Sequence, residues 1–126
     1  MHEGSIARAI ADTVLRHAGA EGAEKILSIE IEIGELTFLS FDQLRFWLDM
    51  EFKDTPAKEA EIKFTSVEAM LKCDACGFSG RPAGEMDTGL HMALPSLSCP
   101  KCGGSRIEWI QGRDAVVRKI EILKTD

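Results

Sequence analysis

The sequence is short of aromatic residues, histidines and long apolar runs, and each shortage excludes a class of protein. Its 126 residues include no tyrosine, six phenylalanines, two tryptophans and three histidines. No apolar run approaches the roughly 18 residues of a membrane-spanning helix, so we expect no membrane insertion. The first residues also lack the basic lead and apolar stretch of a secretory signal, and we therefore expect a cytoplasmic protein.

Basic residues are also in short supply. The chain has 15 lysines and arginines against 21 aspartates and glutamates, which gives a formal net charge of −6. Nucleic-acid binding needs basic side chains that neutralise phosphates, so we expect no nucleic-acid partner. The sequence also lacks a Ser/His/Asp pattern and a G-x-x-x-x-G-K-S/T phosphate loop, and we expect a binding protein that is not an enzyme.

Two segments have the periodicity of amphipathic helices. In residues 5–18, apolar residues recur about every four positions, with Ser5 as the expected N-cap and His17 on the apolar side, partly buried. In residues 40–52, Ser40 is followed three residues later by a glutamine, the spacing of a capping box. The expected apolar side of this second helix consists of Phe41, Leu44, Trp47, Leu48 and Phe52.

Three segments alternate between apolar and polar residues, which predicts strands over residues 26–33, 60–65 and 115–123. In the first strand, the side chains expected to face the core are Leu27, Ile29, Ile31 and Ile33. The strand–helix–strand order from residue 26 to 66 favours a right-handed parallel crossover. The third strand could pair beside either of the others.

Residues 69–110 differ from the rest of the chain, because they are rich in glycine and proline and have few regularly spaced aliphatic residues. Such a segment cannot build much core of its own, so a metal ion would have to hold it together. We therefore predict an α+β fold, with a small mixed sheet and two helices formed by residues 1–68 and 111–126. A zinc-ribbon-like module, residues 69–110, is inserted into it.

The four cysteines form two C-x2-C pairs separated by 22 residues: Cys73 and Cys76, then Cys99 and Cys102. Without a secretion signal, this spacing indicates a metal site rather than disulfides. Four thiolates suit tetrahedral Zn²⁺ and leave no open coordination position, which predicts a structural role. Two alternatives remain: a zinc-ribbon nucleic-acid or transcription module, and a rubredoxin-like electron carrier with iron. Rubredoxins are shorter and richer in aromatic residues.

The N-terminus offers a second set of metal ligands. A bulky residue in second position is expected to prevent removal of Met1. The amine of Met1 and the amide and imidazole nitrogens of His2 could then chelate one ion. Loss of an amide proton to a metal favours Ni(II) or Cu(II) in a square-planar field. A histidine at this position is, however, more often an ordinary tail residue.

The start Met1-His2-Glu3, the run Ile-Glu-Ile-Gly-Glu-Leu over residues 31–36 and the two cysteine knuckles together resemble the HypA/HybF family. These nickel metallochaperones help to mature NiFe-hydrogenase, and the resemblance covers the whole chain. It implies transferable nickel bound by Met1, His2 and Glu3, and structural zinc bound by the cysteines. The long insertion is similar to that of archaeal members, in some of which a histidine before the second knuckle completes the nickel site. The matching residue is His91.

The resemblance also implies partners: a HypB-type GTPase, which would supply the nucleotide hydrolysis that this chain cannot perform, and the hydrogenase large subunit as recipient. The oligomeric state is left open, a homodimer included. The sequence departs from the family at Gly4, where a larger apolar residue is common. A glycine there is expected to leave the first residues looser.

Overall fold

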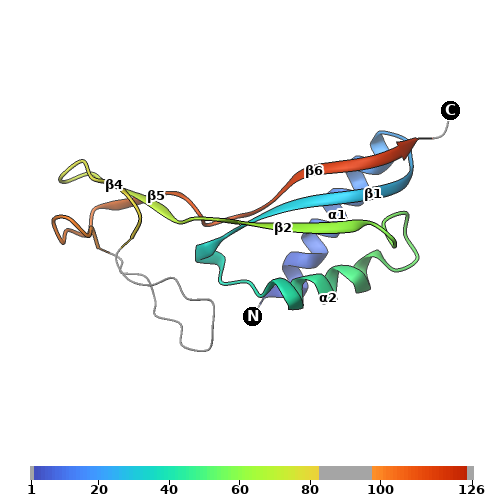
Figure 1. Ribbon diagram of the computed structural model, residues 1–126, viewed down its shortest axis with the longest axis horizontal. Coiled ribbons are helices and arrows are strands. Elements are labelled where there is room, and N and C mark those ends of the chain that lie inside the picture. Colours follow the sequence, from blue (N-terminus) through green and yellow to red (C-terminus); the bar gives the residue numbers. More distant parts are fainter. Residues whose placement is uncertain (1, 83–97, 125–126) are drawn as a thin grey trace. The chain divides into compact units, whose positions relative to one another are not determined.

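The computed structural model describes residues 2–82 and 98–124 (Figure 1). Its elements are α1 (Glu3–Ala20), β1 (Ala23–Gly34), a 3-10 helix (Glu35–Thr37), α2 (Phe41–Phe52), β2 (Glu61–Val67), β3 (Met70–Cys73), β4 (Ser79–Gly80), β5 (Ile107–Gln111) and β6 (Ala115–Lys124). The described residues form two units: an α+β unit (2–32, 39–65 and 115–124) and a cysteine unit (33–38, 66–82 and 98–114). Residues 33–38, predicted to belong with the α+β part, thus group with the cysteines.

The α+β unit contains a three-stranded sheet with β1 in its centre, in the order β2-β1-β6. Strands β1 and β2 run in the same direction and β6 runs against them, so the sheet is mixed (Figure 1). Helices α1 and α2 pack against each other, and α1 also packs against β6. The predicted α+β fold class is therefore confirmed, and the partner of the last strand is β1.

Helix α1 begins at Glu3, two residues earlier than predicted, with His2 as its N-cap. Ser5 is not the cap that the sequence suggested, because it belongs to the first turn of the helix and its hydroxyl donates to the carbonyl oxygen of His2 at 3.1 Å. The expected burial of His17 is also wrong, since that side chain is exposed. The face buried in the core consists of Ala7, Ile10, Ala11, Val14 and Ala18.

Helix α2 begins as predicted, because the Ser40 hydroxyl caps it by accepting a 3.3 Å hydrogen bond from the backbone N–H of Gln43. Its buried residues are Leu44, Leu48 and Phe52. The predicted apolar side was too wide. Phe41 and Trp47 are 37% and 43% exposed. Only the narrower stripe formed by residues 44, 48 and 52 is buried in the core.

The alternation along β1 changes phase near its middle. Ile26 and Ser28 are buried, and so are Ile29, Ile31 and Ile33, so two consecutive residues face inward at 28 and 29. Leu27 was predicted to be in the core, but it lies before this change and is 43% exposed. A slip of one residue moves every earlier side chain to the other face of a strand.

The cysteine unit contains a second sheet in the order β4-β3-β5. β3 is antiparallel to both neighbours, and its register on β5 pairs Leu71 with Trp109 and Cys73 with Ile107. The sequence did not predict these strands, because they are short and their apolar residues too few to set a period. Among the described residues, neither helix is long and apolar enough to cross a membrane.

Candidate metal centre

The two cysteine knuckles have matching backbone geometry. In the first, the N–H of Gly77 donates to the carbonyl oxygen of Cys73 at 3.0 Å; in the second, the N–H of Gly103 donates to that of Cys99 at 2.8 Å. Both glycines have positive φ, +78° and +73°. This conformation suits glycine, so each C-x2-C-G run folds into a tight turn that presents two sulfurs on one side.

The sheet brings the two knuckles together, because β3 ends at Cys73 and β5 begins at Ile107, its register partner. The four Sγ atoms all lie within 4.8 Å of one another. Cys73 and Cys102 are 3.7 Å apart, and Cys76 and Cys99 are 3.6 Å apart. Tetrahedral zinc with Zn–S bonds of about 2.3 Å requires sulfurs about 3.8 Å apart, so the cluster fits zinc.

The surroundings of Cys99 favour the thiolate, which is the form that binds metal. Burial raises the pKa of the Cys99 thiol, but hydrogen bonds from the amides of Cys102 and Lys101 and from neighbouring thiols outweigh it and lower this pKa to about 7. An amide of Phe78 lowers the pKa of Cys76, yet lost solvation and the neighbouring thiols raise it to about 11. Of these two thiols, Cys99 is therefore the more acidic. The amide of Lys101 lies 3.4 Å from this sulfur.

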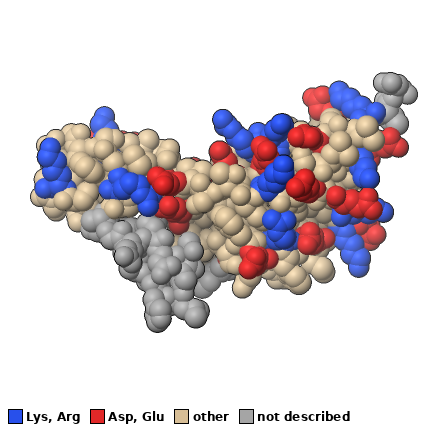
Figure 2. Space-filling model, in the orientation of Figure 1, with Lys and Arg blue, Asp and Glu red and all other residues tan. Residues whose placement is uncertain are grey.

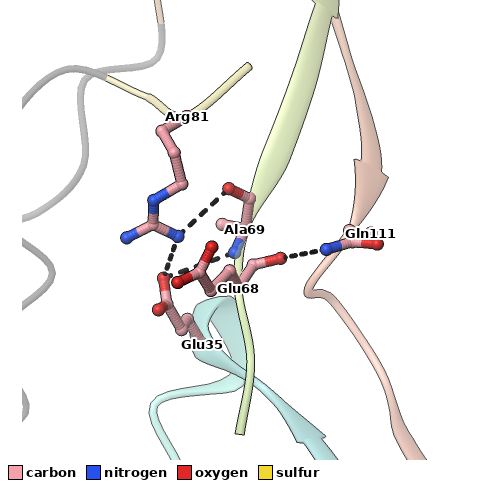
Figure 3. Close-up of polar contacts among 5 residues, drawn as sticks. All are labelled: Glu35, Glu68, Ala69, Arg81 and Gln111. Atoms are coloured by element: carbon pink, nitrogen blue, oxygen red, sulfur yellow. Dashed lines mark hydrogen bonds and ion pairs between the residues drawn. The ribbon is translucent and has the colours of Figure 1, made fainter. Parts of the chain in front are cut away.

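An ion pair between Glu35 and Arg81 links residues 33–38 to the rest of the cysteine unit (Figure 3). The carboxylate of Glu35 accepts hydrogen bonds from the Arg81 guanidinium at 2.7 Å and from the amide of Ala69 at 3.3 Å. Arg81 also donates to the carbonyl oxygen of Ala69 at 3.2 Å, and the Gln111 side-chain amide donates to that of Glu68 at 2.8 Å. No pattern in the sequence predicted this network.

The second candidate site lies at the start of α1, in the α+β unit. His2 has non-helical dihedral angles, φ −120° and ψ 25°, and an exposed side chain. Its carbonyl oxygen accepts the first helical bond, from the amide of Ile6 at 3.0 Å. Because His2 is the N-cap, its own amide precedes the intrahelical hydrogen-bond ladder. A metal could therefore displace the amide proton without breaking the helix.

Glu3 is placed differently from His2. It is only 4% exposed, and one carboxylate oxygen accepts a 3.1 Å hydrogen bond from the backbone N–H of Ser40, the residue that caps α2. This side chain thus links the first turns of both helices. Met1 and His91, the other two residues predicted for nickel, lie outside the described residues.

The charge distribution of the α+β unit is mixed. On the face shown in Figure 2, basic and acidic side chains are interspersed over this unit, without a continuous basic stripe among the described residues. This face of the α+β unit therefore offers little to a phosphate backbone.

The chain is similar along most of its length to proteins of one known family. Residues 1–122 match the family model described as "Hydrogenase/urease nickel incorporation, metallochaperone, hypA". The hydrogenase maturation factor HypA of Methanopyrus kandleri is 40% identical over 125 residues, which cover 91% of this chain and 87% of that protein. The factor of the same name from Pyrococcus horikoshii is 36% identical over 136 residues, covering 98% and 97%.

The fold also has solved counterparts. The solution structure of the Ni metallochaperone HypA from Helicobacter pylori matches with a TM-score of 0.71 at 21% identity, over 99% of this chain and 100% of that one. The resemblance drawn from the sequence is thus confirmed, including the expectation of a maturation factor that is not an enzyme. The chain belongs to the HypA family of nickel-incorporation metallochaperones.

Proposed function

We propose that this chain binds Ni(II) at its N-terminus and delivers it for the maturation of NiFe-hydrogenase, while the four cysteines hold a structural zinc ion. The observation that carries the proposal is the placement of His2. An exposed imidazole and an amide outside the helical ladder occur in one residue next to the terminal amine. These three nitrogens form adjoining chelate rings on one metal ion.

The ligand set favours metals that acidify amides. A cation at a helix N-terminus faces the positive end of the helix dipole, an unfavourable interaction of about 0.3–1 kcal/mol. A deprotonated amide offsets this charge, and Ni(II) and Cu(II) accept amide nitrogens in square-planar geometry whereas Zn²⁺ has no such preference. The helix start therefore disfavours Zn²⁺ relative to Ni(II).

Glu3 and His91 are the remaining nickel residues that the family resemblance implies. Because the Glu3 carboxylate is buried and bonded to Ser40, we assign it to holding the segment in place rather than to the metal. His91, or a solvent oxygen, then completes the coordination.

Delivery requires a site that opens. The nitrogens belong to the first two residues of the chain, so a small change in the backbone there breaks the chelate. The cysteine site has four protein ligands drawn from two knuckles and does not open in this way. We propose a HypB-type GTPase as the partner that drives transfer and the hydrogenase large subunit as the recipient.

The decisive experiment compares His2→Ala with His17→Ala, a matched control because His17 is an exposed histidine on the same helix. Both proteins need an untagged N-terminus. Calorimetry with Ni(II) should show loss of binding in His2→Ala and normal binding in His17→Ala, with zinc content unchanged in both. Normal nickel affinity in His2→Ala would overturn the proposal.

A second measurement separates the two metals. Protons compete with nickel for the amine, amide and imidazole nitrogens, so acidification should release nickel while the four thiolates still hold zinc. A mild chelator should likewise remove nickel first. Loss of zinc before nickel would show that the structural and transferable roles are assigned to the wrong sites.

A further inference from the structure

We infer that Trp47 is a positioning residue for nickel: its indole ring lies against Gly4 and holds the metal-binding segment on α2. The inference rests on the proposed N-terminal nickel site and adds a residue from a different helix to it. The sequence suggested that Gly4 leaves the first residues loose. The structure places a large aromatic ring on that glycine instead.

The geometry of the contact is specific. A Cβ atom built on Gly4 would lie 3.7 Å from both Cδ2 and Cε2 of Trp47 and 4.0 Å from Cζ2. These atoms belong to the six-membered ring of the indole, so even the first side-chain atom at position 4 would already be in van der Waals contact with the ring. A residue with atoms beyond Cβ would have to share this space with the indole. The indole of Trp47 thus occupies the space into which a longer side chain at position 4 would extend.

A second contact fixes the same segment to the same helix. The Glu3 carboxylate accepts the backbone N–H of Ser40, and Ser40 is the N-cap of α2. Residues 3 and 4, which directly follow His2, are therefore held by a hydrogen bond at the start of α2 and by an indole about two turns further on. Because α1 and α2 also pack against each other, α2 supports the N-terminal segment.

This support bears on nickel affinity because the chelating atoms belong to a chain end. A free terminus must lose conformational freedom when its nitrogens close around a metal, and a segment that is already anchored loses less. Trp47 is 43% exposed, more than is usual for a tryptophan that serves only the core. Its removal should therefore affect the metal more than the fold.

The test uses Trp47→Ala, with Met50→Ala as the matched control. Met50 is a large apolar residue on α2, 56% exposed, and it does not approach Gly4 within 4 Å. Trp47→Ala should weaken Ni(II) affinity about fivefold to tenfold and speed nickel release similarly, the range expected when about one anchored residue becomes free. Met50→Ala should leave both unchanged. Urea unfolding, followed by circular dichroism, checks that the helices remain stable in both variants.

A compensating exchange distinguishes positioning from general stability. In Gly4→Tyr combined with Trp47→Ala, an aromatic ring is supplied from α1 instead of α2, and nickel affinity should return to within about twofold of the original. Trp47→Phe should give an intermediate affinity and covers the case in which Trp47→Ala does not fold. Additive losses in the double variant would contradict the inference.

Fluorescence gives a direct signal. In a Trp109→Phe background, the remaining emission comes from Trp47, and Ni(II) should quench it in proportion to occupancy, with one equivalent at saturation. Adding His2→Ala should abolish the quenching. If His2→Ala binds nickel normally, the proposed site itself is wrong. If His2→Ala loses nickel but Trp47→Ala and Met50→Ala bind it equally well, only the role of Trp47 is wrong.

Discussion

The carboxylate of Glu35 lies 2.7 Å from the Arg81 guanidinium, although the two residues are 46 positions apart in the sequence. Arg81 follows β4, the strand that leaves the first cysteine knuckle, and Glu35 follows β1. The pair therefore links the segment 33–38, which follows β1, to the segment that follows β4 within the cysteine unit (Figure 3). The Glu35 side chain is 17% exposed, so the interaction is less screened than a surface ion pair.

Replacing Glu35 by alanine should destabilise the cysteine unit by about 1–3 kcal/mol, because the buried amide of Ala69 loses its acceptor together with the arginine. The measurement is urea unfolding of the zinc-loaded protein, monitored by Trp109 emission in a Trp47→Phe background. Trp109 lies on β5, so its emission reports on the cysteine unit.

Glu121→Ala is the control, because both side chains of the Lys119–Glu121 pair are more than half exposed. It should change stability by less than about 0.5 kcal/mol. Equal effects of the two variants would show that the Glu35 pair is only a surface contact.

Gly34→Ala should destabilise the cysteine unit severely, by about 3 kcal/mol or more, since no flexible side chain is available to move aside. A Cβ on Gly34 would lie 2.2 Å from the carbonyl carbon of Gly112, and one on Gly112 would lie 2.6 Å from Cα of Ala69. The backbone segments around residues 34, 69 and 112 thus pass close to one another, and only glycine fits at positions 34 and 112. Gly19→Ala, in open space near the end of α1, should be neutral or mildly stabilising. Thermal unfolding of both variants tests this contrast, and similar melting temperatures would exclude a tight crossing.

Local patterns explain which features the sequence predicts correctly. The C-x2-C-G spacing requires two residues and a positive φ within one turn, so the knuckles follow from five consecutive residues. Ser40 and Gln43 are likewise neighbours on one helical turn, and the cap they form was predicted. The mixed α+β fold follows from periodicity over segments of eight or more residues.

The features that were missed depend on contacts between distant residues. Helix α1 begins at Glu3 rather than Ser5, where the Glu3 carboxylate bonds to Ser40, 37 positions away. Trp47 fits the apolar period of α2, yet its ring lies on Gly4 and remains partly exposed. No pattern within one segment contains either relationship, so only the tertiary structure supplies them.

Removal of zinc should unfold the cysteine unit and leave the α+β unit folded. The cysteine unit has few buried apolar side chains of its own, among them Ala69 and Leu71, whereas structural zinc contributes on the order of 10–16 kcal/mol in small peptides. Cys76→Ser should abolish amide-exchange protection in β3 and β5 while protection in β1 before residue 33 persists. Ser79→Ala, an exposed serine of the same unit, should leave both intact. Equal protection of β3 and β5 in metal-free and zinc-loaded protein would contradict a metal-dependent fold.

Glu3 offers a way to distinguish a metal ligand from a residue that holds the ligands in place. Glu3→Gln keeps an oxygen that can accept the Ser40 N–H but removes the negative charge that a metal would seek, whereas Glu3→Ala removes both. If the carboxylate positions the segment, the Ni(II) affinity of Glu3→Gln should stay within about threefold of that of the original protein. Glu3→Ala should lose nickel affinity and about 1–2 kcal/mol of stability.

If the Glu3 carboxylate instead binds nickel, Glu3→Gln and Glu3→Ala should lose nickel affinity to the same extent, while only Glu3→Ala loses stability. Calorimetry and urea unfolding on one set of untagged proteins give both quantities. Glu24→Gln, which removes an exposed carboxylate from the same unit, corrects for the change in net charge. A stable Glu3→Gln protein without nickel affinity would move this residue into the coordination sphere. Retained nickel affinity in Glu3→Gln, together with its loss in Glu3→Ala, would indicate that the nitrogens of Met1 and His2 bind the metal and that Glu3 holds them in place.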